Sequence, residues 1–204
     1  MGQNIKMTPL QMDALKEAVS IGAGNAATAL SKMASTRVDM SVPKASIVAV
    51  SAIPKLVGKN KDIQLLIRVN ILGDAPGAIL ITMSMASAIT LSDILMERKA
   101  GQTKKLGPMD MSAIQEVGNI MTGNYLRALE TFLKVPFRSS VPFIAMDEEG
   151  KILSGVLSEL EKETDHAVVI ETELRDKEHE IQTQFFLIPS ARSLEKILEV
   201  LGVC

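Results

Sequence analysis

Two pairs of polar residues in this sequence have side chains whose types and spacing suit them to act together. Glu17 with Ser20 is the first pair, and Glu116 with Asn119, 99 positions later, is the second. Residues three positions apart on a helix lie on the same face, so the two members of each pair are expected to be neighbours. One such pair is usually ordinary helix surface. The repetition of the pair beside a repeated glycine instead favours a surface interaction site.

Both pairs lie in a 27-residue block that occurs twice. The copies, Glu17–Pro43 and Glu116–Pro142, share nine residues when they are aligned without a gap. A period of 99 in a chain of 204 residues predicts two related halves. The mismatch with the largest chemical consequence is Ser20 against Asn119, because only the second copy has an amide at this position.

Four further residues on the same helix faces are predicted to bind a partner. Asp13 and Gly24 flank the first pair, and Ser112 and Gly123 flank the second. These rows lie opposite the apolar stripe of each helix, so they are expected to face solvent. A glycine inside a helix costs roughly 1 kcal/mol relative to alanine. A glycine repeated one turn beyond each pair is therefore expected to leave a notch for a partner.

Two long helices are predicted to position the pairs. Apolar residues recur at steps of three and four, which predicts helices over 10–34 and 109–134. Pro9 marks the start of the first helix. Gly22 and Gly118 lie toward the buried sides, where we expect them to let helices cross at close range.

Short apolar runs after each helix predict strands, and each half is predicted to close with a shorter helix. The predicted strands are Ser46–Val50, Ile63–Ile71, Ala78–Met83, Ile152–Leu157, Ala167–Leu174 and Ile181–Ile188. Hairpin turns are predicted at 73–77 and 175–180, and closing helices at 86–96 and 193–201. Strands linked by hairpins imply a largely antiparallel sheet, so the predicted fold class is α+β with a pseudo-twofold duplication.

The whole chain, 1–204, is predicted to be a single domain built of two repeats, about 8–96 and 109–202. Residues 97–108 are polar and bounded by Gly and Pro, as is typical of a linker. Because this linker is short, we expect the two halves to share one sheet or to pack as pseudo-twofold mates.

Composition excludes several classes of function. A net charge of −2 gives no general attraction to nucleic acid or to anionic membranes. No apolar run approaches the roughly 20 residues that span a bilayer, and the N-terminus lacks the apolar stretch of a signal peptide. The single Cys204 and two histidines in charged stretches offer neither a disulfide framework nor a thiolate zinc site. We therefore expect a cytoplasmic protein without a metal site of its own.

The second copy resembles the signature of a known family. Ser112, Glu116 and Asn119, followed 23 positions later by Pro142, resemble the motif of the CheC/CheX/FliY family of chemotaxis phosphatases. The first copy has the same frame with serine in place of asparagine. The stretch IGAGNAATAL, residues 21–30, is also similar to CheC proteins, and the resemblance covers essentially the whole chain.

This resemblance implies hydrolysis of the phosphoaspartate of the response regulator CheY. By the family mechanism, Glu116 would pair with the active-site lysine of CheY, and Asn119 would orient the attacking water. An acyl phosphate is already activated, so its hydrolysis needs mostly positioning and charge stabilisation. The Mg²⁺ is supplied by phosphorylated CheY, so the resemblance implies no cofactor bound by this chain itself.

Ser20 is where the chain departs from the family motif. Its side chain is shorter than asparagine and has no amide, and a displacement of about 1 Å can cost on the order of 100-fold in rate. The first site is therefore predicted to be weak or inactive, while Glu17 can still support docking.

The sequence leaves other functions open. CheC relatives bind the receptor deamidase CheD, so a mainly non-catalytic adaptor of CheD, regulated by phosphorylated CheY, is one alternative. A flagellar-switch component related to FliY and a dimerisation module with glycine-notched helices are two others. The acidic stretch 147–149 is a candidate partner contact, although a simple turn is the more common role of such a segment.

Overall fold

The computed structural model describes residues 8–57, 64–99, 101–147, 151–162, 164–175 and 179–200. In chain order the elements are α1 (Pro9–Met33), β1 (Asp39–Ala49), the 3-10 turn η1 (Val50–Ala52), α2 (Ile53–Val57), β2 (Gln64–Leu72), β3 (Gly77–Ser84), α3 (Met85–Leu95), α4 (Pro108–Leu133), β4 (Arg138–Ser139), β5 (Phe143–Asp147), α5 (Lys151–Leu160), β6 (His166–Arg175), β7 (Glu180–Pro189) and α6 (Ala191–Val200). The two halves therefore follow one plan, from a long helix through a first strand, a shorter helix and a hairpin to a closing helix.

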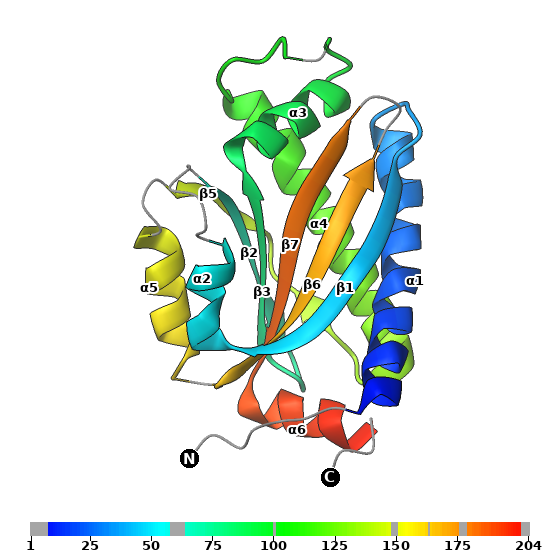
Figure 1. The fold of residues 1–204 in the computed structure, drawn as a ribbon, viewed down its shortest axis with the longest axis vertical. Helices are drawn as coiled ribbons and strands as arrows, with labels where there is room; N and C mark the ends of the chain where they lie inside the picture. The colour runs from blue at the N-terminus through cyan, green and yellow to red at the C-terminus, as the bar shows by residue number, and fades with distance from the viewer. Residues whose placement is uncertain are drawn as a thin grey trace.

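One antiparallel sheet combines the strands of both halves. Its order is β1-β6-β7-β3-β2-β4, and β5 also pairs with β2 (Figure 1). The first strand of each half thus pairs with the hairpin of the other half, and β3 pairs with β7 at the centre. Because the halves exchange strands in this way, we infer that they form a single domain.

The two faces of the sheet carry different layers. The long helices α1 and α4 pack side by side over one face; in Figure 1 α4 runs behind the sheet and α1 lies at the right, next to β1. Alternate residues of a strand point to opposite faces, so Ile67 of β2 contributes to the core under these helices, whereas Leu66 contributes to a second, smaller core with α5. Most buried side chains, including Tyr125, belong to the first core. The helix with the Glu116 pair is therefore anchored along its whole buried side.

The predicted close crossing is confirmed at Gly22. A Cβ at this position would lie 3.1 Å from the backbone oxygen of Asn124 and 3.1 Å from the Cα of Tyr125, so α1 and α4 approach at backbone distance. At Gly118 the predicted close contact with another helix is wrong, because a Cβ there would meet Ile67 Cδ1 of strand β2 at 2.9 Å. That glycine lets α4 lie close to the sheet and not to another helix.

The predicted strand Ile152–Leu157 is wrong, since these residues lie in helix α5. The buried residues Leu153, Leu157 and Leu160 are spaced by four and three, which is a helical period, and they pack on the second core. Asp147 caps this helix, because its carboxylate accepts hydrogen bonds from the backbone N–H groups of Ile152 and Leu153 at 3.0 and 2.9 Å.

The capping role of Asp147 removes it from the candidate partner contact at 147–149. The side chain of Asp147 is buried and used in capping, so it is not a surface contact. Residues 148–149 lie outside the described part of the chain.

The other predicted elements differ from the structure mainly at their ends, whereas α2, β4 and β5 have no counterpart in the prediction. β1 begins at Asp39, seven residues before the predicted start, and Val50 belongs to the 3-10 turn. Gly73, in the turn that joins β2 to β3, has a φ of 101°, a conformation that favours glycine. Residues 63, 176–178 and 201–202 of the predicted elements lie outside the described ranges. In the part of the chain described here, no helix combines the length and apolarity that crossing a membrane requires.

Candidate functional site

Helix α4 begins with a buried cluster of hydrogen bonds around Asp110. Pro108 occupies its first turn, and the Asp110 carboxylate accepts from the backbone N–H of Gly107 at 2.7 Å. The same carboxylate accepts from Ser92 Oγ at 2.6 Å and from the Arg98 guanidinium at 2.5 Å. These bonds connect the start of α4 to the end of α3 and to the linker.

The charge of Asp110 is stabilised by the same contacts. Hydrogen bonds from Ser92, from the Gly107 backbone and from Arg98 lower the pKa of Asp110 from 3.8 to about 2, against the opposing effect of burial. The carboxylate is therefore ionised at neutral pH. A negative charge in the first turn also interacts favourably with the helix dipole. The position of the helix is thus fixed less than two turns before Glu116.

The periodicity of α4 places the polar pair on its outer face. Ile114, Val117 and Met121 are fully buried in the core, whereas Glu116 and Asn119 between them are exposed. Asn119 Nδ2 lies 3.5 Å from Glu116 Oε2, at the outer limit for a hydrogen bond. The two side chains hold each other only weakly, so both retain the capacity to bind a partner.

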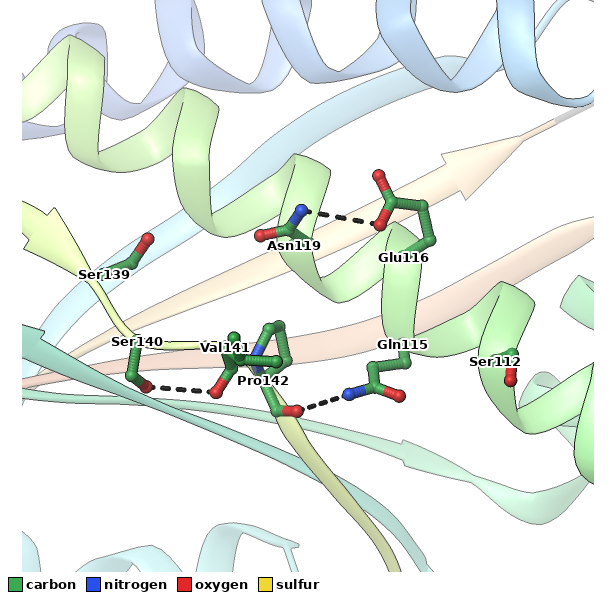
Figure 2. A pocket seen from close by; sticks show the side chains of 8 residues that line it. All are labelled: Ser112, Gln115, Glu116, Asn119, Ser139, Ser140, Val141 and Pro142. Carbon is green, nitrogen blue, oxygen red and sulfur yellow. Dashed lines mark hydrogen bonds between the residues drawn. The ribbon is translucent and has the colours of Figure 1, made fainter.

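A cavity of about 300 Å³ lies beside this pair (Figure 2). One wall is helix α4, and the other is the segment that joins β4 to β5. The lining residues are Ser112, Gln115, Glu116, Asn119, Ser139, Ser140, Val141 and Pro142. The structure thus brings Ser112, Glu116 and Asn119 to one cavity with the Pro142 of the same motif.

Two sets of hydrogen bonds hold the second wall. Gln115 Nε2 donates to the carbonyl oxygen of Pro142 at 2.5 Å, so the helix is connected directly to the segment opposite (Figure 2). Ser140 donates its backbone N–H to Asn70 O at 2.9 Å, and Asn70 N–H donates to Ser140 Oγ at 3.0 Å. The wall is therefore connected both to α4 and to β2.

The remaining predicted site residues lie outside this cavity. Gly123 is half-buried one turn beyond Asn119, and a Cβ on it would meet nothing within 4 Å. On α1, the first set is present at the surface: Asp13, Glu17 and Gly24 are exposed, and Ser20 is half-buried. A Cβ at Gly24 would also enter open space.

Sequence reasoning missed four residues of the cavity, namely Gln115, Ser139, Ser140 and Val141. Gln115 precedes the motif glutamate and carries no periodic signal, so only the fold reveals its contact with Pro142. Val141 had a signal, because the tripeptide Ser-Val-Pro occurs in both copies of the repeat. Among the residues that the structure describes, no group of three or more His, Cys, Asp or Glu side chains is arranged to hold a metal ion.

Comparisons with known proteins agree with the motif. The model of the CheC-like family matches residues 10–47 and 109–146, which contain the two copies of the repeat. The CheY-P phosphatase CheC of Bacillus subtilis (strain 168) is 32% identical over 196 residues, which cover 94% of each chain.

Solved structures share the fold at lower sequence identity. Thermotoga maritima FliY superposes with a TM-score of 0.75 at 18% identity, over 97% of this chain and 98% of that chain. A chain of the CheX-CheY-BeF3-Mg²⁺ complex from Borrelia burgdorferi gives a TM-score of 0.52 at 16% identity, over 88% and 97%.

Proposed function

This chain belongs to the CheC-like family, and on that premise we propose that it hydrolyses the phosphoaspartate of the response regulator CheY. The observation that carries the proposal is the placement of Glu116 and Asn119 on one exposed helix face beside an open cavity. The 32% identical relative of similar length is named as a CheY-P phosphatase, which supports the same substrate. The proposal places the chain in the cytoplasm together with CheY.

The proposed mechanism uses binding and orientation. The exposed carboxylate of Glu116 pairs with the active-site lysine of CheY and fixes how the helix docks. Asn119 holds a water molecule in line with the phosphorus, because an amide can accept one hydrogen bond from the water and donate another. The reactive acyl phosphate and the Mg²⁺ both belong to CheY, so the chain contributes position and not a metal.

The geometry of α4 suits this mechanism. The hydrogen bonds of Asp110 fix its first turn, and Gly118 lets its middle lie against Ile67 of the sheet. A water that must be aimed to within about 1 Å requires such a support, since a displacement of that size costs on the order of 100-fold in rate. The first pair has no amide at Ser20, so we propose that it docks weakly and contributes little hydrolysis.

The test measures the decay of phosphorylated CheY in the presence of the wild-type protein and of the Asn119→Ala variant. The wild type is expected to accelerate the decay, and Asn119→Ala to lose about 100-fold of that acceleration. Ser20→Ala is the matched control and is expected to retain nearly all of it. If Asn119→Ala kept most of the activity while Ser20→Ala abolished it, the assignment of the two sites would be reversed.

Binding of CheD is a separate hypothesis from the sequence resemblance. It makes its own prediction, namely that CheD co-purifies with this chain whether or not Asn119 is replaced. Loss of hydrolysis with retention of CheD binding in Asn119→Ala would assign the two roles to different surfaces.

A further inference from the structure

The same tripeptide occupies opposite environments in the two repeats. Ser-Val-Pro occurs at 41–43 and at 140–142, in each case where pairing with the neighbouring strand is interrupted. Val42 is only 7% exposed and belongs to the main core, whereas Val141 is 82% exposed and lines the cavity beside Asn119. Identical local sequence therefore buries the valine in one repeat and presents it to solvent in the other.

Exposure of Val141 is maintained by specific contacts. The Pro142 carbonyl accepts the hydrogen bond from Gln115, and Ser140 is bonded to Asn70 of β2. Residues on both sides of Val141 are thus held, one to the helix and one to the sheet. At the position equivalent to Gln115 the first repeat has Lys16, so it lacks this amide.

We propose that Val141 is a recognition residue for the phosphorylated response regulator and that Gln115 is the positioning residue that holds it. This inference rests on the proposed function, because it assigns the second wall of the same cavity. A regulator that docks with its phosphoaspartate against Glu116 and Asn119 must also cover the opposite wall of the cavity. The partner surface that fits there is apolar and borders the phosphorylated aspartate.

The size of the expected effect follows from the exposure of Val141. Full burial of a valine side chain is worth about 1.5–3 kcal/mol, which corresponds to roughly 10- to 100-fold in an equilibrium constant. Serine in its place removes the apolar contact while leaving a small side chain. We therefore expect Val141→Ser to raise the KM for phosphorylated CheY about tenfold with kcat nearly unchanged, since the contact is made equally in the ground and transition states.

The experiment measures KM and kcat for four variants and the binding of CheY loaded with Mg²⁺ and beryllofluoride. The variants are Val141→Ser, Gln115→Met, their double variant, and the control Val200→Ser. Val200 is 49% exposed on α6, away from the cavity, so it controls for loss of a surface valine. Methionine is close to glutamine in length but cannot donate to the Pro142 carbonyl, and it adds no charge.

Each outcome decides the inference. Val141→Ser and Gln115→Met are each expected to raise the KM and to weaken binding. The double variant is expected to have nearly the same KM as Val141→Ser, since Gln115 acts by positioning Val141. Val200→Ser is expected to match the wild type. If the wild type hydrolyses phosphorylated CheY but Val141→Ser has the same KM as the wild type, the recognition role alone is overturned. Additive effects in the double variant would overturn the positioning role, and a wild type without hydrolysis or binding would overturn the proposed function as well.

Discussion

Restoring the missing amide in the first repeat tests whether Ser20 is the reason for its predicted weakness. The informative protein is the double variant Ser20→Asn, Asn119→Ala, in which only the first repeat has an asparagine three positions after its motif glutamate. If the amide alone defined a competent site, this variant would regain the activity that Asn119→Ala loses. The structure predicts a smaller recovery, because the first site differs in its wall as well.

The expected size comes from Val42. Its side chain is 7% exposed in the core, so the first site lacks the exposed valine of the second, where Val141 is 82% exposed. Loss of one well-buried valine contact at an interface corresponds to about tenfold or more in affinity. With Asn119→Ala about 100-fold below the wild type, Ser20→Asn is therefore expected to raise kcat/KM to no more than about a tenth of the wild-type value.

The assay is the decay of phosphorylated CheY at subsaturating concentration, which reports kcat/KM. Asn119→Ala alone and Ser20→Ala, Asn119→Ala provide the baseline, and their equality would show that Ser20 itself contributes no hydrolysis. Recovery of the double variant to the full wild-type kcat/KM would refute the reasoning, since the wall around Val141 would then contribute nothing to the difference between the sites.

Two further predictions concern the helix that positions the pair. Gly123→Ala adds a Cβ into open space, so it is expected to stabilise the fold by up to about 1 kcal/mol in thermal unfolding. The same Cβ fills the predicted notch and is expected to raise the KM for phosphorylated CheY. Gly24→Ala on α1 is the control and is expected to gain stability without changing the KM. An unchanged KM in Gly123→Ala would show that the notch is not used. Asp110→Asn removes a carboxylate whose pKa is lowered from 3.8 to about 2 in the folded protein. The lowered pKa contributes roughly 2 kcal/mol to the free energy of unfolding above pH 4, and this contribution is lost as the pH falls toward 2. Urea unfolding should therefore find Asp110→Asn less stable at pH 7 and nearly equal to the wild type near pH 2, and a difference that did not depend on pH would contradict this account.

The long helices were predictable because their signals are local. The predicted ranges 10–34 and 109–134 agree with Pro9–Met33 and Pro108–Leu133 to within one residue at each end, since proline marks each start and the apolar period continues to each end. The run Ile152–Leu157 was misread because a short apolar segment fits a strand as well as a buried helix. The helical spacing of Leu153, Leu157 and Leu160 becomes visible only when the run is extended to residue 160, and the packing of these residues on the second core confirms the helix.

The strands that flank the site depend on contacts that no local pattern reveals. β4 and β5 pair with β2, which lies in the other half of the sequence. The candidate residues Glu116 and Asn119 were found because their spacing is repeated, and the structure places both beside one cavity. The contact between Gln115 and the Pro142 carbonyl joins residues 27 positions apart, so its existence follows from the fold and not from the sequence of either segment.

The exchange of strands implies that the first half remains indispensable even if its own site is weak, as predicted. The second wall of the cavity joins two strands that pair with β2, with Ser139 opposite Ile71 and Phe143 opposite Arg68. Helix α4 in turn packs against α1 at the distance that Gly22 permits. Because both walls of the second site are supported by elements of the first repeat, substitutions in α1 such as Gly22→Ala can reduce hydrolysis without touching either polar pair. The first repeat can thus lose its amide and still be required as the scaffold of the other site.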